Sequence, residues 1–478
     1  MGNYSSNIKH IKYNHKVMYD ALKIWIENYK NILSPPIDNE HNKAIPIPVL
    51  QNKLNLIVGE NNIGKTNILR AMSKLSLVSS SNIFFNNKIN NARRYSRNED
   101  KPRKIDSDLD NAKWSFKLEF DLPKSKNDEI INKISKSTEF SPDEYKKLKH
   151  EIDNFKSFKL IFSGKLNEDQ EDKPRFSHPF DEVTCKDHQT WIHDNFYNEI
   201  IKLYPEIVNL IDDISPEIET HITYTNADIN MKNSKFKYLS LILNSFTKNP
   251  DEVMNRLKEL KKPTMSSNEE DKLEAINKWN EMIKHVNKQF EIKIDEIFKN
   301  FESLNCKLKV SLDSKTADIH IGVNSENKIC ASSLNNQGKG VIKLIKLIYI
   351  ISICINEKEK NFLILIDEIC NNLSVKTQYS LLKYLKSVIS ENKNIFVVLT
   401  THSPVFFWKE QNDKYSDYLN VVICESDGKN GLYYASYVDI DTSIKQGIEM
   451  KSKKILEGYD VLSKILDYPV EKLKKFKI

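Results

Sequence analysis

The sequence predicts an α/β protein, a mixed sheet flanked by helices, with a helical insertion. Three observations support this class. Residues 54–58 are apolar apart from Asn55 and lead into a glycine-containing loop and a helix, and two later apolar segments, residues 362–366 and 395–399, end in polar residues. Apolar runs of this length are typical of parallel strands that are buried on both faces. Their alternation with helical segments favours a sheet covered by helices.

The other expected elements rest on shorter patterns. Alternating or apolar segments predict further strands at residues 22–32, 44–50, 114–122, 158–164, 306–312, 317–323, 418–426 and 431–438. Prolines at positions 46 and 48 restrict the second of these strands to a sheet edge. Helices are expected at residues 64–76 and 376–391. Apolar residues that recur every three or four positions predict a long helix over residues 266–304.

The length of 478 residues favours two structural units or one enlarged domain. The expected elements divide the chain into five segments. In chain order these are residues 1–20, a polar lead-in; residues 21–165, the first part of the α/β unit; residues 166–304, a mainly helical insertion; residues 305–412, the second part of the α/β unit; and residues 413–478, a C-terminal hairpin with helices.

The composition indicates an ordinary globular protein. The 72 basic and 66 acidic side chains nearly cancel, so the formal charge of +6 permits a nucleic-acid partner without requiring one. The six cysteines are scattered without a CxxC pair, which favours free thiols in a reducing cytoplasm over a zinc site or disulfides. The longest apolar run, residues 347–355, is about half of the ~18–20 residues that cross a bilayer, so no membrane segment is expected.

Residues 59–66 match the phosphate-binding pattern G-x-x-x-x-G-K-[ST] between an expected strand and an expected helix. In such a loop, backbone N–H groups surround phosphate oxygens, and the N-terminus of the helix adds a positive dipole. We expect Lys65 to reach the β- and γ-phosphates of ATP and Thr66 to bind Mg²⁺. The expected nucleotide contacts are Gly59, Glu60, Asn61, Asn62, Ile63, Gly64, Lys65, Thr66 and Asn67.

The apolar segment 362–366 ends in Asp367 and Glu368. Buried carboxylates are costly unless they are used, so a strand that ends in two of them indicates a site. Asp367 suits a direct or water-mediated Mg²⁺ ligand, and Glu368 suits a group that orients or deprotonates the attacking water. His402 follows the next expected strand, at the sheet edge where ligands gather in α/β proteins. We expect it to contact the γ-phosphate.

Together, the glycine loop, "ILIDE", "TTHSP", "NNQGKGVIKLI" and the opening "LKIWIENYKNI" resemble the ABC-type ATPase heads of the OLD/RecF/SMC group. The sequence is most similar to ATPase subunits of bacterial anti-phage defence, of Septu-like or PARIS-like type. The resemblance implies a P-loop ABC-type ATPase head that pairs head to head around ATP. It also implies that a signature segment of a second subunit covers the nucleotide, and Asn336, Gly338 and Gly340 match that segment.

The sequence departs from the family pattern at three places. Asn336 stands where a serine is usual, no glutamine occurs between Thr66 and Ser163, and Ser374 stands where histidine-proline is frequent. We therefore expect slow ATP hydrolysis, suited to a switch more than to a motor.

The sequence is compatible with three functions and favours the first. It is an ATP-dependent sensor or scaffold that forms dimers or higher homo-oligomers and controls a separately encoded nuclease or toxin. DNA and a phage protein are its other candidate partners. The second is a RecF- or SMC-like DNA-binding ATPase of repair or recombination. Its candidate phosphate contacts are Arg93, Arg94, Arg97, Arg103 and Lys104.

The third function is a self-contained OLD-like nuclease. Such enzymes carry a metal-binding nuclease domain after the histidine motif, and Asp439 and Asp441 superficially offer its ligands. The remaining tail is too short for that domain, so a β-hairpin with an acidic turn is expected here instead. Nuclease activity of this chain alone is therefore not expected.

Overall fold

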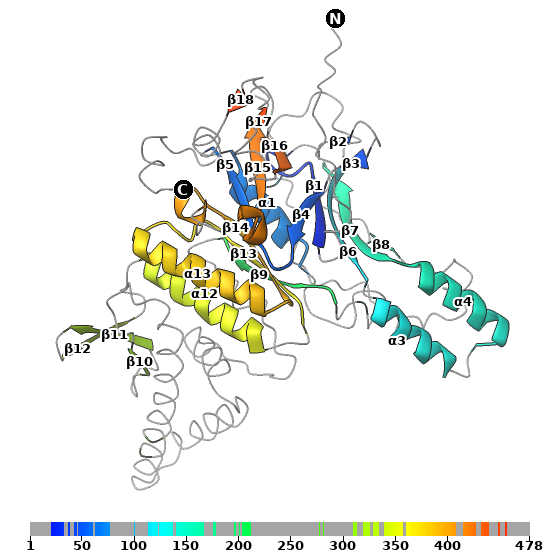
Figure 1. Ribbon diagram of the computed structural model, residues 1–478, viewed down its shortest axis with the longest axis horizontal. Coiled ribbons are helices and arrows are strands. Elements are labelled where there is room, and N and C mark those ends of the chain that lie inside the picture. The colour runs from blue at the N-terminus through cyan, green and yellow to red at the C-terminus, as the bar shows by residue number, and fades with distance from the viewer. Residues whose placement is uncertain are drawn as a thin grey trace, which may run out of the picture.

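The structure, a computed structural model, describes two packed sheets and the helices around them (Figure 1). The described residues are 21–32, 37–38, 43–44, 46–60, 63–76, 100, 113–122, 124–136, 140–166, 175–177, 196, 200, 203–211, 277, 281, 309–312, 319–325, 328–333, 339–356, 360–407, 414–426, 432–438, 448–449 and 455–456. The expected lead-in at residues 1–20, most of the expected long helix at 266–304 and the expected terminal helices lie outside them.

The larger sheet has six strands, and its five consecutive strands from β15 to β9 run parallel. Its spatial order is β16 (Leu432–Val438), β15 (Leu419–Ser426), β5 (Leu54–Gly59), β14 (Ile395–Thr400), β13 (Phe362–Ile366) and β9 (Glu206–Leu210). Every residue of β5, β13 and β14 is buried, as their largely apolar sequences predict. Because these strands are parallel, their carboxyl ends share one edge of the sheet.

The second sheet is antiparallel and has five strands. Its order is β4 (Ile47–Leu50), β1 (Ala21–Glu27), β6 (Lys113–Asp121), β7 (Ser157–Lys165) and β8 (Arg175–Phe176). Strands β1, β6 and β7 mostly alternate between buried and less buried residues, which is typical of a sheet with one covered face. The proline-containing strand β4 lies at the edge, so that prediction is confirmed.

Helix α1 (Lys65–Ser73) lies between the two sheets and contacts strands of both. Its buried face, which includes Ile68, Leu69 and Met72, belongs to a core shared by the antiparallel sheet and one face of the parallel sheet. The opposite face of the parallel sheet forms a second core with α12 (Lys339–Asn356) and α13 (Val375–Glu391). These two helices lie side by side over that face (Figure 1). The result is the expected mixed α/β architecture.

A helical hairpin that the sequence analysis did not predict connects β6 to β7. It consists of α3 (Lys124–Ser135) and α4 (Pro142–Asn154), and it projects away from the sheets (Figure 1). Helix α4 begins with a capping box in which Ser141 and Glu144 bond each other's backbone N–H groups. This Ser-Pro-Asp-Glu start was the available sequence signal. Few apolar residues follow it, so the periodicity is weak.

Two short strands belong to the sheets although they fall in the expected helical insertion, residues 166–304. Strand β8 pairs with β7, and β9 pairs in parallel with β13. The α/β unit therefore continues past residue 165 as far as the end of β9. Both strands are short, and β9 lies at a sheet edge, where an apolar run is not required.

The remaining described elements are small. They are β2 (Ile37–Asp38), β3 (Lys43–Ala44), the three-stranded sheet of β10 (Lys309–Leu312), β11 (Ile319–Ser325) and β12 (Lys328–Ser333), the 3₁₀ helix η7 (Pro404–Phe407), α14 (Tyr415–Tyr418), β17 (Ile448–Glu449) and β18 (Ile455–Leu456). Strands β15 and β16 pair as the expected antiparallel hairpin. Within the described ranges, no helix combines the length and apolarity needed to cross a membrane.

A buried amide joins four strands near the amino end of β5. Asn55 accepts a bond from the N–H of Leu50 at 2.7 Å and donates to the carbonyl oxygens of Leu50 at 3.0 Å and Val397 at 2.9 Å. The side chain of Asn420 donates to the Asn55 oxygen and to the Pro48 carbonyl, both at 2.8 Å. Strands β4, β5, β14 and β15 are thereby fixed to one another. This contact links the two sheets through polar groups that have no access to water.

Replacing Asn55 with aspartate tests this link. An aspartate cannot donate to the two carbonyl groups and places a charge in a buried position, so Asn55→Asp is expected to lower the unfolding free energy by about 3 kcal/mol. Chemical unfolding monitored by circular dichroism measures it. The control is Asn52→Asp, the same change at an exposed residue with positive φ, which aspartate also tolerates. Equal stability of the two variants would contradict the assigned role.

Candidate functional site

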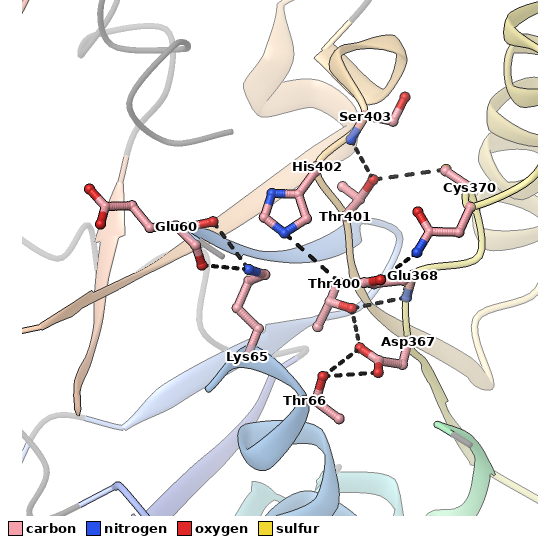
Figure 2. A network of polar contacts seen from close by, with 12 residues as sticks. Glu60, Lys65, Thr66, Asp367, Glu368, Cys370, Thr400, Thr401, His402 and Ser403 are labelled. Carbon is pink, nitrogen blue, oxygen red and sulfur yellow. Dashed lines mark hydrogen bonds and ion pairs between the residues drawn. The ribbon is translucent and has the colours of Figure 1, made fainter. Parts of the chain in front are cut away.

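Three segments meet at the carboxyl ends of β5, β14 and β13 (Figure 2). Two of them follow β13 and β14, and the third is the loop that follows β5. Its two glycines have φ angles of 152° at Gly59 and 105° at Gly64, which other residues adopt only with strain. A Cβ atom on Gly59 would lie 2.7 Å from the carbonyl oxygen of Cys424, and one on Gly64 would overlap the amide group of Asn31. Both positions therefore require glycine for conformation and for space.

The amine of Lys65 is folded back onto this loop. Lys65 is only 5% exposed, and its Nζ donates to the carbonyl oxygens of Gly59 at 3.1 Å and Glu60 at 2.8 Å (Figure 2). These bonds compensate a buried ammonium group. Phosphate oxygens can replace the two carbonyl groups, since charge-assisted bonds to an anion are stronger than bonds to a neutral acceptor.

Asp367 connects the glycine loop to the end of β13. The hydroxyl of Thr66 donates to the Asp367 carboxylate, at 2.9 Å from Oδ2 and 3.2 Å from Oδ1. Thr400, at the end of the intervening strand β14, donates to the same carboxylate (Figure 2). Burial raises the pKa of Asp367, the two threonine hydroxyls oppose that rise, and the nearby charge of Glu368 adds to it. A buried carboxylate with these surroundings is suited to a cation.

The donor set fits Mg²⁺. The Thr66 hydroxyl and the Asp367 carboxylate offer hard oxygen atoms on one side of the loop, and Mg²⁺ is usually held by one or two carboxylates together with substrate phosphates. Among the described residues, no group of three or more His, Cys, Asp or Glu side chains could hold a metal ion.

Glu368 has a strained backbone and a more accessible side chain. Its φ angle is 47°, and its N–H donates to the Thr400 hydroxyl at 3.0 Å. The Glu368 side chain is 37% exposed, accepts a bond from the Asn371 amide, and lies 3.9 Å from Nε2 of His402. The positive φ of Glu368 changes the direction of the chain directly after Asp367. The side chains of Asp367 and Glu368 therefore lie in different environments. The exposed one can accept a proton from water.

The family model of the AAA ATPase domain matches residues 22–407, which is most of the chain. The chain belongs to the AAA ATPase domain family. Its fold is a mixed α/β architecture in which helices flank the sheets. A search of curated proteins finds no match.

Solved structures of two kinds are similar to this chain over most of its length at low identity. The Smc head of Pyrococcus furiosus bound to the C-terminal domain of ScpA is 13% identical, with 89% of this chain and 98% of that chain covered and a TM-score of 0.41. The SMC head of Thermotoga maritima is 12% identical, with 88% and 100% covered and a TM-score of 0.35. RecF bound to ATP is 16% identical, with 88% and 100% covered and a TM-score of 0.36.

The structure brings most of the sequence-predicted site residues of this AAA ATPase domain together. These are Gly59, Glu60, Ile63, Gly64, Lys65, Thr66, Asn67, Asp367, Glu368 and His402. Gly340 lies at the start of α12, where a Cβ atom would be 2.5 Å from the carbonyl oxygen of Asn372 in the same chain. Outside the described residues lie Asn61, Asn62, Arg93, Arg94, Arg97, Arg103, Lys104, Asn336, Gly338, Asp439 and Asp441.

The sequence analysis missed Asn31, which supports the glycine loop from the turn after β1. Its Nδ2 donates to the carbonyl oxygen of Ile63 at 3.0 Å, and its Oδ1 accepts from the side chain of Asn67 at 2.7 Å. Asn67 is therefore directed toward Asn31 within this domain. The amide of Asn31 also fills the space beside Gly64. The only sequence signal was the likeness of "NYKNI" to the family's first strand.

Replacing Asn31 with aspartate tests this support. A carboxylate would face the Ile63 carbonyl oxygen and add negative charge beside the phosphate loop, so Asn31→Asp is expected to weaken ATP binding by roughly tenfold or more. Fluorescence titration with a labelled ATP analogue measures the affinity. The control is Asn28→Asp in the same turn, because Asn28 bonds the Lys113 carbonyl instead. Equal losses in both variants would rule out a specific role for Asn31.

Proposed function

We propose that this chain is a Mg²⁺-dependent ATPase that acts as a switch, in which ATP-bound heads pair and thereby control a separately encoded effector. The observation that carries the proposal is the contact of Thr66 with Asp367. It brings the end of β13, which is followed by two carboxylates, next to the phosphate-binding loop after β5. Both halves of an ATPase site are thus joined within one chain.

Each residue has a role that follows from its position. The backbone of residues 59–64 and the amine of Lys65 bind the phosphates of ATP. Thr66 and Asp367 hold Mg²⁺, which when bound neutralises phosphate charge. Glu368 orients the attacking water and accepts its proton. His402, which lies 3.9 Å from the Glu368 carboxylate, contacts the γ-phosphate.

Slow turnover is supported by the surroundings of Glu368. The Asn371 amide donates to its carboxylate. That bond occupies one carboxylate oxygen, which leaves one oxygen of Glu368 to orient the attacking water. Together with the departures at Asn336 and Ser374, this contact supports a switch that remains in its ATP-bound state for longer than a motor does.

Head-to-head pairing is supported by the resemblance and by the position of Gly340. In the proposed dimer, Asn336, Gly338 and Gly340 cover the ATP bound by a second copy of the chain. Gly340 is the second residue of α12, an 18-residue helix whose N-terminus favours an anion. A dimer that closes around ATP opens after hydrolysis, and this change can be transmitted to a partner.

The proposal includes a separate effector because the sequence resembles defence ATPases of Septu-like or PARIS-like type. In this view the chain is a cytoplasmic sensor of DNA or a phage protein, and the effector is a nuclease or toxin. The RecF- or SMC-like function shares the ATPase site and differs in its partner, which would be DNA held by the basic residues at 93–104.

Replacing Glu368 with glutamine tests the switch. The amide keeps the shape of the side chain but cannot accept the proton, so hydrolysis is expected to fall by roughly a hundredfold or more while ATP stays bound. With ATP and Mg²⁺, the variant should persist as a dimer in light-scattering chromatography. Lys65→Ala is the matched control, and it is expected to lose ATP binding and remain unpaired. Hydrolysis by Glu368→Gln at the wild-type rate would contradict the proposed role.

The same two variants identify the partner. Each is tagged in the native host, and the copurifying molecules are identified by mass spectrometry and nucleic-acid sequencing. The proposal expects a nuclease or toxin whose recovery differs between the ATP-locked Glu368→Gln and the ATP-free Lys65→Ala. Recovery of DNA alone, lost when salt is added, would instead support the RecF- or SMC-like function.

A further inference from the structure

The amide side chain of Gln378 joins the two loops that carry Glu368 and His402. Gln378 lies near the start of α13 and is half-buried. Its Nε2 donates to the carbonyl oxygens of Leu373 at 2.9 Å and Cys370 at 3.3 Å. Its Oε1 accepts from the hydroxyl of Ser403 at 2.5 Å. One side chain thus bonds the turn after β13 and the loop after β14.

Each of these loops is adjacent to a proposed site residue. The turn at residues 369–373 begins directly after Glu368, and His402 stands between Thr401 and Ser403. The Thr401 hydroxyl accepts from the Ser403 N–H at 2.9 Å and donates to Sγ of Cys370 at 3.8 Å (Figure 2). Sulfur is a weak acceptor, so the stronger bond between the two loops passes through Gln378.

The bonded groups have little access to water. Thr401 is 1% exposed and Ser403 is 9% exposed. The Ser403 hydroxyl also accepts from the N–H of Val405 at 3.2 Å, which fixes its orientation toward Gln378. A buried hydroxyl or carbonyl that loses its partner is destabilised, so loss of the amide would make the loops rearrange.

The turn is packed from its other side as well. A Cβ atom on Gly340 would lie 2.5 Å from the carbonyl oxygen and 2.9 Å from the carbonyl carbon of Asn372, and Asn372 itself has a φ of 66°. The start of α12 and the side chain of Gln378 therefore bracket the turn. With that side fixed by backbone contact, the amide of Gln378 acts together with the Thr400 hydroxyl, which accepts from the Glu368 N–H, to set how far the turn lies from the His402 loop.

We infer that Gln378 is a positioning residue for ATP hydrolysis. It fixes the distance between the loops of Glu368 and His402, so that the two side chains face the same phosphate group of ATP. This inference rests on the proposed function, because it requires that Glu368 and His402 act on ATP. Gln378 acts through the loops and does not contact the nucleotide.

Three substitutions test separately the bonds of Gln378 to the turn after β13 and to the loop after β14. Gln378→Met keeps the volume of the side chain and removes all its hydrogen bonds. Gln378→Glu keeps an acceptor for Ser403 but places a carboxylate against the two carbonyl oxygens of the turn. Ser403→Ala leaves the amide on the turn and removes the bond to the other loop. Lys383→Met, at an exposed position of the same helix, is the matched control.

We expect all three variants to lower kcat by about tenfold or more, because small displacements of catalytic groups have effects of this size. The KM for ATP should stay near its wild-type value, the melting temperature should fall because buried groups lose partners, and Lys383→Met should match wild type in all parameters. Since both residues act through one bond, Gln378→Met combined with Ser403→Ala should be no slower than the slower single variant.

A kcat of Ser403→Ala within about twofold of wild type would overturn the inference, as would losses that multiply in the double variant. A rise in KM without a fall in kcat would also overturn it. If Gln378→Met does not fold, the kcat values of Ser403→Ala and Gln378→Glu decide whether the inference holds. Failure of the proposed function is a separate result, seen as wild-type hydrolysis by Glu368→Gln.

Discussion

The hydrogen bond between Thr66 and Asp367 is the contact on which the rest of this structure depends. It joins residues 301 positions apart, and it forms because β5 and β13 end at the same edge of the parallel sheet. The two strands are not neighbours. Strand β14 lies between them, and its last residue, Thr400, bonds both the Asp367 carboxylate and the Glu368 N–H. Any change of strand order would separate the groups of the site.

The packing of the molecule keeps this edge rigid. The parallel sheet is covered on one face by α1 and the antiparallel sheet, and on the other by α12 and α13. Charged groups at the edge are compensated locally, as Lys65 is by loop carbonyls and Asp367 is by two hydroxyls. These compensating bonds are weaker than those available from Mg²⁺ and phosphate. The site is therefore stable without a ligand. Its charged groups can exchange these bonds for bonds to Mg²⁺ and phosphate.

The sequence was sufficient for the parts that depend on local pattern. Largely apolar runs identified β5, β13 and β14, and the residues that follow them identified Lys65, Thr66, Asp367, Glu368 and His402 as one group. Asn31, Thr400 and Gln378 could not be found in this way. Their contacts reach across the fold to segments far away in the chain or around a turn, and nothing in their immediate sequence shows which backbone groups they will meet.

The elements that were missed have a similar explanation. Helices α3 and α4 carry few apolar residues because they project from the sheets, so their periodicity is weak. Strand β9 is short and lies at a sheet edge, within a stretch whose later part has strong helical periodicity. Its assignment depends on pairing with β13, a partner more than 150 residues away. Such pairing is a property of the folded molecule.

The central claim is that Thr66 and Asp367 together hold the metal of a nucleotide site. Its most direct test is the affinity of the protein–ATP complex for Mn²⁺, used in place of Mg²⁺ and measured by electron paramagnetic resonance. The account predicts that Asp367→Asn and Thr66→Val each weaken Mn²⁺ binding by roughly tenfold or more, while Asn52→Asp leaves it unchanged. Wild-type Mn²⁺ affinity in both site variants would contradict the account.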